Sequence, residues 1–481
     1  PTIGLEIHAE LKTKTKMFCC SKNDADAPLP NVNICPVCLA HPGTLPVING
    51  EAVRHVLREG LALKARLADY TEFDRKSYFY PDLPKGYQLS QYEYPLVSGG
   101  ELNGVMITRV HLEEDTASSI HTSLNTDEEG SGTTTIDYNR AGVPLMELVT
   151  EPVITSAKQA GDFARELQLL LRYLDVSDAN MEKGEMRVEA NISLSRAGLK
   201  LGTKVEVKNL NSFRAMERAV EYEIKRQKAL LLKGEEVVQE TRGWNEEKQE
   251  TFPQRIKEGS ADYRYFPDPD LPCLKLSELE EYAPDVLAKT LPELPWERRE
   301  RYSLLGVRSQ DSDSFVRERK LGDFFEEVIR GNERDSRRVE LASNYIANDL
   351  VSIIRDTVKR DTENSAEIGI SALNFKKIVD MVADRKISSR VAKDILLRVV
   401  TVGGDPEKIA RDGNLFQTSS GGDFDVVIAE VLAQNASVAQ DFKAGKLAAL
   451  EYLVGQSMKA TKGAGDPSIM RDLILGAIEK S

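Results

Sequence analysis

Strict alternation of apolar and polar residues limits the N-terminal part of this chain to β-structure. In IGLEIHAEL, residues 3–11, apolar side chains alternate with Glu6, His8 and Glu10. Because side chains along a strand have a period of two, the apolar set faces a core and the opposite face carries carboxylate, imidazole and carboxylate. That row is either the solvated face of a strand or a set of metal ligands.

Alternation of apolar and polar residues recurs through about the first 285 residues. MRVEANISL (186–194) and TKVEVKNL (203–210) alternate in the same way. Residues 156–174 instead place their apolar side chains at helical spacing behind Ser156, a plausible N-cap. This part predicts an α+β fold with mostly antiparallel sheet.

Beyond residue 290 the periodicity is helical. LGDFFEEVI (321–329) and NFKKIVDMV (374–382) have apolar residues at i, i+3, i+4 and i+7, which indicates amphipathic helices. VTVGGDPEKI (400–409) contains two glycines and a proline, which interrupt helices, and it predicts a domain boundary. A last helix aligns four apolar residues: Leu447, Leu450, Val454 and Met458. A chain of 481 residues exceeds one compact core, so about two to four domains are expected.

Composition excludes several classes of protein. With 41% hydrophobic and 29% charged residues and no apolar run of about 20 residues, we expect no membrane span. No basic-then-apolar leader precedes the first strand, and we expect no signal peptide. The net charge of −13 argues against a protein that coats nucleic acid over its whole surface, but it permits a local basic patch.

Four of the five cysteines cluster, as CC at 19–20 and CPVC at 35–38. This spacing is typical of a structural zinc site, and the alternatives are a redox dithiol or buried free cysteines. The expected ligands are Cys19, Cys20, Cys35 and Cys38. Adjacent cysteines rarely bind one ion together, so either His41 or Asp24 could complete a set with one of that pair. The cysteine usage fits a reducing, cytoplasmic location.

Further acidic residues stand in strand-like context. HLEEDTASSIH places Glu113 beside His111 and Asp115, and NRAGVPLMELVTEP contributes Glu147. Singly, such carboxylates are more often solvated than functional. Together with the N-terminal row they form a carboxylate and imidazole set that suits Mg²⁺ or Mn²⁺ beside a phosphate. The chain has neither a P-loop nor a Gly-rich dinucleotide motif, so any nucleotide site follows another scheme.

Two more segments are dense in polar groups. FDRKSYFYPDLPKGYQLSQ (73–91) gathers lysines and tyrosines around two prolines: Lys76, Tyr78, Tyr80, Lys85 and Tyr87. EVKNLNSF (206–213) places Lys208 at the end of a strand, just before a helix. These groups either decorate a surface or line a polar pocket or channel.

Taken together and in order, these segments resemble one family: GatB, the B subunits of the glutamyl-/aspartyl-tRNA amidotransferases. The resemblance extends through DYRYFPDPDLP, ELPWERRERY and YLVGQSMKATKGAGDP. It implies a cradle domain over residues 1–288 that carries the zinc knuckle, an all-α helical domain over 289–405, and a small all-α tail over 406–481. The tail would be YqeY-like and would bind tRNA.

The resemblance also implies an activity and partners. ATP would phosphorylate the side-chain carboxylate of Glu-tRNA(Gln) or Asp-tRNA(Asn), and ammonia from a separate glutaminase of the amidase family would displace the phosphate. That glutaminase and a small third protein would complete a heterotrimer with this chain. The sequence does not distinguish the two tRNA substrates.

Site residues follow from the same resemblance. The catalytic set would be Glu6, His8, Glu10, Glu113, Glu147, Glu189 and Lys208. Magnesium would be held by His8, Glu113 and Glu147. The ammonia channel would use Lys76, Tyr78, Lys85, Tyr87 and Glu113. The tRNA contacts of the tail would be Lys443, Lys446, Lys459 and Lys462. The chain departs from the family pattern at Ala117–Ser118, where Gly-Lys is common, and at Cys19–Cys20, where Cys-x-Cys is usual.

Two competing functions remain. A non-catalytic, zinc-containing tRNA-binding protein would show a basic face but no ordered acidic cluster. The glutaminase itself would need a Ser-Ser-Lys type nucleophile arrangement, for which we find no candidate in the sequence.

Overall fold

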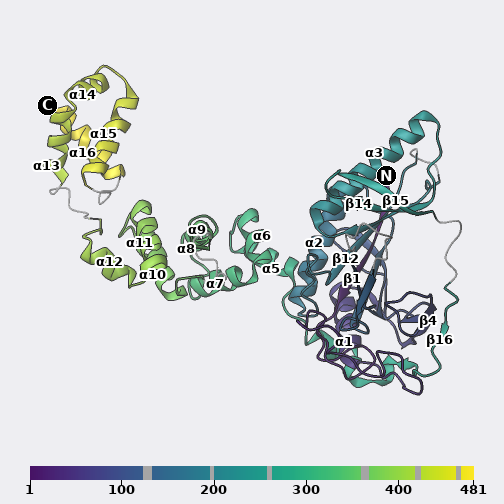
Figure 1. Cartoon of the computed structure of the whole chain (residues 1–481). Coiled ribbons are helices and arrows are strands. Elements are labelled where there is room, and N and C mark those ends of the chain that lie inside the picture. The colour runs from purple at the N-terminus through teal and green to yellow at the C-terminus, as the bar shows by residue number, and fades with distance from the viewer. Residues whose placement is uncertain are drawn as a thin grey trace. The chain divides into compact units, whose positions relative to one another are not determined.

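The computed structural model describes residues 1–122, 133–195, 200–256, 263–358, 368–417, 424–461 and 467–480. Two compact units divide the chain between Pro295 and Trp296. The first unit contains the strands and the second is helical (Figure 1). The expected fold class, α+β followed by all-α, is confirmed.

The first unit is built on a mixed sheet that has β1 (Thr2–Glu10) near its middle. Among the described residues, ten strands form this sheet, in the order β15-β14-β13-β12-β1-β11-β8-β6-β2, with β7 beside β8. The pairs are antiparallel except β13–β14. The other strands of the sheet are β2 (Arg66–Leu67), β6 (Val97–Ser98), β7 (Glu101–Leu102), β8 (Val105–Glu114), β11 (Pro144–Thr150), β12 (Met186–Ser193), β13 (Val205–Leu210), β14 (Glu240–Asn245) and β15 (Glu250–Ile256).

Helices cover the apolar face of this sheet. Ile3, Leu5 and Ile7 are fully buried, as the alternation predicts. Helix α2 (Ala157–Tyr173) contacts β1, and α3 (Phe213–Lys233) contacts β12 and β13, so both lie alongside the sheet (Figure 1). Ser156 caps α2 as expected, because its hydroxyl accepts a hydrogen bond from the Gln159 N–H at 3.1 Å.

Smaller sheets frame one edge of the polar face. Strand β4 (Asp74–Ser77) lies between β16 (Phe266–Pro267) and β5 (Tyr87–Ser90), and β5 contacts β8. The remaining elements of this unit are β3 (Tyr70–Thr71), β9 (Ser118–Thr122), β10 (Thr133–Asp137), β17 (Leu274–Lys275), α1 (Gly50–Ala62), α4 (Pro284–Ala288) and two 3₁₀ turns, η1 (Leu276–Glu278) and η2 (Glu280–Tyr282).

The second unit consists of short helices. They are α5 (Pro295–Leu304), α6 (Ser309–Arg317), α7 (Arg319–Ile329), α8 (Ser336–Asn344), a π-helical turn η3 (Tyr345–Leu350), α9 (Val351–Val358), α10 (Ala372–Ala383), α11 (Ser389–Val402), α12 (Pro406–Asp412), α13 (Phe424–Gln434), α14 (Ala436–Lys443), α15 (Leu447–Ala460) and α16 (Pro467–Lys480). None of the helices in the described part of the chain has the length and apolar character needed to cross a membrane.

The helical stripes read from the sequence are mostly buried. Phe324 and Phe325 of α7 and Phe375 of α10 lie in the core. In α15 the expected stripe is wrong at Leu447, which is 78% exposed at the first turn, while Leu453 is fully buried. Ala449 and Leu450 of the same turn are buried, so the buried face of α15 includes Leu450, Leu453 and Val454 and excludes Leu447.

Helices α13, α15 and α16 share a core of their own that includes Phe424, Leu453 and Met470. Helix α12, which a boundary at residue 406 assigns to the tail, contacts α10 and α11. The three-domain division stays a prediction.

Helix α1 contains a fully buried carboxyl group. Glu59 is 0% exposed, and neither of its oxygens has a hydrogen-bond partner in the described part of the chain. Burial raises the pKa of Glu59 from 4.5 to about 8. Between these two values the unfolded chain releases this proton and the folded chain retains it. The stability contributed by this group therefore falls as pH rises from 4.5 through 8.

We expect Glu59→Gln to stabilise the protein at pH 8, by on the order of 2 kcal/mol, and to change stability little near pH 4.5. Denaturant unfolding across this pH range measures the effect. Glu51→Gln, on the same helix with a half-exposed side chain, is the matched control and should change neither value. An unaltered slope of stability against pH in Glu59→Gln would contradict the interpretation.

Candidate active site and metal centres

Strand register converts the alternation of β1 into a row of ionisable side chains across the sheet. His8 lies opposite Glu147 of β11, and Glu147 lies opposite His111 of β8. On the other side, Arg187 of β12 lies opposite His8. Residues directly opposite in antiparallel strands project from the same face. Arg187, His8, Glu147 and His111 therefore form one continuous set, the central row.

The three expected magnesium ligands, two of them members of this row, meet on the same face of the sheet. His8 Nε2 lies 3.5 Å from Glu113 Oε1 and 3.4 Å from Glu147 Oε2, and the three ligand atoms lie within 4.8 Å of one another. Glu113 and Glu147 are buried, and Ser90 Oγ donates to Glu113 Oε2 at 3.2 Å. The structure therefore brings together the set expected to hold magnesium.

The electrostatics of this group favour a cation. Burial opposes protonation of His8, but its hydrogen bond to Glu147 and the charges of Glu147 and Glu113 outweigh it and raise the pKa of His8 to about 9. Burial likewise opposes ionisation of Glu147, yet the charges of His111 and His8 hold the pKa of Glu147 well below its usual range. The two carboxylates supply the hard oxygen ligands that Mg²⁺ and Mn²⁺ prefer, and the imidazole of His8 adds one nitrogen beside them.

A second acidic group lies on neighbouring strands. Ligand oxygens of Glu6, Glu189 and Glu206 lie within 4.8 Å of one another. Lys208 Nζ lies 2.8 Å from Glu189 Oε2 and 3.7 Å from Glu206 Oε1, and Asn191 Nδ2 donates to Glu6 Oε1 at 2.7 Å. The sequence-predicted Glu6, Glu189 and Lys208 thus come together. Glu206 was missed, although it alternates with Lys208 in the same run.

Glu10 joins neither acidic group. Burial, together with the charge of Asp115, raises the pKa of Glu10 to about 8 against the opposing charges of Arg187 and Arg140. Asp115 itself accepts a hydrogen bond from Arg187 Nη2 at 2.7 Å. Glu10 therefore lies at the margin of the polar face, beside an ion pair that the sequence did not predict.

The residues expected to line a channel fall into two groups, which have different carboxylate partners. Lys76 of β4 lies toward the expected magnesium ligands: burial disfavours its ammonium, yet the charges of Glu113 and Glu147 outweigh this and raise the pKa of Lys76. Its Nζ also lies 5.3 Å from the ring centroid of Tyr263. Tyr78 Oη donates to Gln88 Oε1 at 3.2 Å.

Lys85 has a different carboxylate partner. The Lys85 ammonium contacts Glu114 Oε1, and the same oxygen accepts a hydrogen bond from the Leu89 N–H at 2.9 Å. Lys85 Nζ also lies 5.7 Å from the ring centroid of Tyr87. The expected channel that includes both Lys85 and Glu113 stays a prediction, and the structure adds Glu114 as the carboxylate that Lys85 contacts. Glu113 and Glu114 are consecutive in β8, so their side chains leave the strand in different directions.

A cavity of about 300 Å³ adjoins this ion pair. Lys85, Tyr87 and Glu114 line it together with the cysteine loop, through Cys19, Cys38 and His41.

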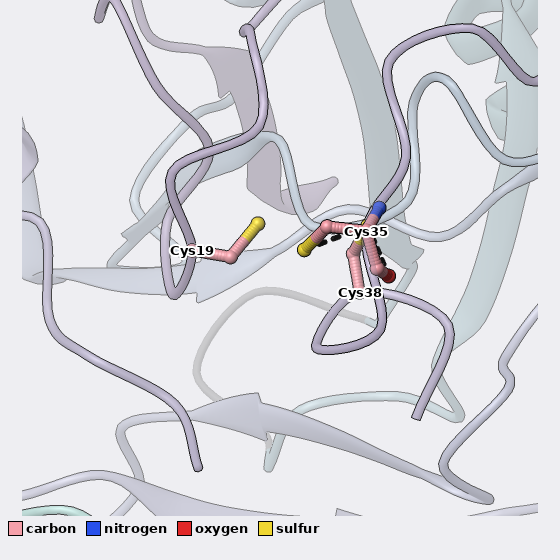
Figure 2. Close-up of side chains that lie close together, drawn as sticks. All are labelled: Cys19, Cys35 and Cys38. Atoms are coloured by element: carbon pink, nitrogen blue, oxygen red, sulfur yellow. Dashed lines mark hydrogen bonds between the residues drawn. The ribbon is translucent and has the colours of Figure 1, made fainter. Parts of the chain in front are cut away.

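The cysteine loop brings three thiols together, not four. Sγ atoms of Cys19, Cys35 and Cys38 lie within 4.8 Å of one another, and Cys19 points toward the other two from a separate stretch of loop (Figure 2). Cys20 is exposed and lies outside this group, since side chains of adjacent residues diverge from the backbone. The four-thiolate set expected from the sequence is corrected to these three, the three-cysteine group. The five cysteines are free, so no disulfide competes for the thiols.

Hydrogen-bond donors surround Cys38. The Cys35 N–H donates to Cys38 Sγ at 3.1 Å, and Lys16 Nζ and Ser21 Oγ lie 3.9 Å from the same sulfur. The Cys19 thiol contact, in company with the Cys35 N–H and the charge of Lys16, lowers the pKa of Cys38 to about 5. A sulfur held as thiolate is the form that binds a metal. The donor set of the three-cysteine group therefore fits Zn²⁺.

The tail lysines are exposed where the structure describes them. Lys443, Lys446 and Lys459 reach solvent, and Lys446 Nζ pairs with Asp441 Oδ1 at 3.0 Å. Lys462 lies outside the described residues.

Comparison with known proteins gives a consistent result over the whole chain. Residues 1–280 match the family model described as the GatB/GatE catalytic domain, and residues 323–478 match one described as the GatB domain. A relative from Thermomicrobium roseum is 42% identical, with 99% of this chain and 98% of the relative covered. Relatives from Thermus thermophilus (41% identical, 99% and 98% covered) and Picosynechococcus (40%, 98% and 96%) are equally extensive. All three are named as the B subunit of an aspartyl/glutamyl-tRNA(Asn/Gln) amidotransferase.

Proposed function

The chain belongs to the GatB/GatE family, and we propose that it is the component that activates and amidates the amino acid on a mischarged tRNA. ATP would phosphorylate the side-chain carboxylate of Glu-tRNA(Gln), Asp-tRNA(Asn) or both, with release of ADP. Ammonia would then attack the acyl phosphate, and phosphate would leave as the amide forms. Phosphorylation is needed because a carboxylate is a poor electrophile at neutral pH.

The observation that carries this proposal is the group of His8, Glu113 and Glu147 on the polar face of the sheet. Phosphoryl transfer depends on positioning and on neutralising phosphate charge, with little need for a protein nucleophile. A bound divalent cation would supply that neutralisation. The charges of Glu113 and Glu147 act on Lys76, whose ammonium offers a further positive charge for a phosphate oxygen. This ordered acidic group argues against a purely tRNA-binding protein.

We propose that ammonia travels to the active site along a path that passes Lys85 and Glu114. Polar walls hydrogen-bond neutral ammonia, and an ammonium–carboxylate pair such as Lys85–Glu114 can open and close a narrow path. Tyr87 and the cavity beside it would form part of this path. The ammonia itself would come from an amidase-type glutaminase, held to this chain by a small third protein, in the cytoplasm.

The three-cysteine group is proposed to hold a structural zinc ion. A bound ion would fix two stretches of loop against one another, and zinc in a site closed by protein ligands has a structural role. Zinc would stabilise the wall of the cavity next to Lys85 and Glu114.

ATP hydrolysis by the purified complex tests the proposal directly. ADP release is expected to rise with Glu-tRNA(Gln), with Asp-tRNA(Asn) or with both, and to stay basal with uncharged tRNA. The tRNA that stimulates ADP release identifies the substrate. Equal stimulation by charged and uncharged tRNA would contradict activation of the amino acid side chain.

The exposed lysines of the tail are proposed to contact the tRNA backbone. We expect Lys443→Ala/Lys459→Ala to raise the KM for charged tRNA, and to reduce the slope of log affinity against log salt by about two, because two phosphate contacts are lost. Lys446→Ala is the matched control, since its ammonium is already paired with Asp441 and should contribute less. A salt slope unchanged in the double variant would exclude this surface from tRNA binding.

A further inference from the structure

Lys16 is buried against the three-cysteine group. Its side chain is 0% exposed; Nζ lies 3.9 Å from Cys38 Sγ and donates to the Tyr138 carbonyl oxygen at 3.0 Å. A buried ammonium group is costly unless an anion balances it. The Cys38 thiolate is the anion that Lys16 contacts.

This lysine limits the charge of any fourth metal ligand. Three thiolates around a divalent ion leave one negative charge, and the ammonium of Lys16 neutralises it. An anionic fourth ligand would return an uncompensated charge next to the buried Cys38 and Lys16, whereas a neutral nitrogen ligand would not. Charge balance therefore favours imidazole over carboxylate or a fourth thiolate.

The positions of the candidate ligands agree with this limit. Cys20 and His41 are both exposed and both lie outside the three-cysteine group, but Cys20 does not line the cavity that Cys19 and Cys38 line. Asp24 pairs with Lys22 at 2.6 Å and lines a different cavity, beside Glu10. His41 lines the same cavity as Cys19 and Cys38, on the loop that follows Cys38.

We infer that the zinc site of this chain is a Cys₃His site, completed by His41 and charge-balanced by Lys16. The inference rests on the proposed zinc site and goes beyond it in naming a neutral fourth ligand and a positioning residue. His41 would reach the metal from the cavity side. Its exposed side chain is free to turn, because no buried packing is lost when it moves.

Cobalt substitution of the full-length protein tests the ligand set without reference to activity. Co²⁺ in the wild-type protein should give a sulfur-to-cobalt charge-transfer band for three thiolates and the visible d–d bands of a tetrahedral S₃N site. His41→Ala should retain the charge-transfer band, shift the d–d bands, and raise the Kd for Zn²⁺ about tenfold or more. Added imidazole should restore the wild-type spectrum in His41→Ala but not in Cys35→Ser.

Two variants serve as matched controls, Cys20→Ser and Asp24→Asn, and both should leave the spectrum and the Kd unchanged. Lys16→Met should weaken metal binding about tenfold while the spectrum stays S₃N, because Lys16 balances charge without ligating. An unshifted spectrum in His41→Ala, or loss of a thiolate band in Cys20→Ser, would overturn the inference. Failure of the wild-type protein to bind Zn²⁺ or Co²⁺ would refute the zinc site itself.

Discussion

Replacement of His8 by alanine is expected to reduce amide formation on charged tRNA by about two orders of magnitude or more, while glutamine hydrolysis by the partner glutaminase remains measurable. His8 is the one nitrogen donor of the proposed magnesium group, and its Nε2 faces Glu113 at 3.5 Å and Glu147 at 3.4 Å. Its loss leaves two buried carboxylates facing one another. Formation of amide-tRNA at a series of Mg²⁺ concentrations measures the effect, and raised Mg²⁺ should recover part of the activity.

His111→Asn provides the matched control. His111 contacts the same carboxylate, with Nε2 3.3 Å from Glu147 Oε2, but it is not a member of the three-atom ligand group. We expect a smaller loss and a modest rise in the Mg²⁺ requirement, because His111 orients a ligand without being one. If the two variants lost equal amounts of activity, His8 would have a structural role in the sheet and would not be a metal ligand. Normal activity of His8→Ala at limiting Mg²⁺ would exclude it as a ligand.

Alternation identified the polar face of this sheet but not the pairs that form on it. Glu6 and His8 could be assigned to one face of their strand, and Glu189 to the polar face of another strand, because a strand has a period of two. The contact between His8 and Glu147 depends on the antiparallel register of two segments that lie some 140 residues apart in the chain. The contact between Glu147 and His111 depends in the same way on the register of a third segment. Periodicity has no information on register, so that part came from the family resemblance.

Local geometry explains the corrected assignments. Cys20 was expected to bind metal because it adjoins Cys19, yet neighbouring side chains diverge and only Cys19 reaches the group. Lys16 carries no signal in the sequence, because its role depends on burial that tertiary packing alone creates. Glu114 was passed over for the same kind of reason: a carboxylate beside a predicted ligand is normally solvated, and here it is buried under Lys85.

The Lys85–Glu114 pair leads to the second large expected effect. Lys85→Met should uncouple the two half-reactions, lowering glutamine-dependent amide formation about tenfold or more while glutamine is still hydrolysed. Glu114 is 4% exposed, and without Lys85 its Oε1 retains the Leu89 N–H at 2.9 Å but no counter-ion. Breaking a buried ion pair by removing one partner costs about 3 kcal/mol, so the cavity wall should rearrange around the unpaired carboxylate. The ratio of amide-tRNA formed to glutamine consumed measures the uncoupling.

Ammonium salts separate a blocked path from a damaged active site. Lys85 contacts Glu114 and not the magnesium group, so ammonium supplied from solution should restore amide formation in Lys85→Met to near the wild-type rate. Glu114→Gln should behave in the same way if the pair acts as a unit. Lys22→Met, whose ammonium pairs with Asp24 and lines no part of this cavity, is the control and should stay coupled. If the glutamine-dependent and ammonium-dependent rates of Lys85→Met fall in parallel, Lys85 serves the phosphorylation site, because a defect confined to delivery cannot slow a reaction whose ammonia arrives from solution.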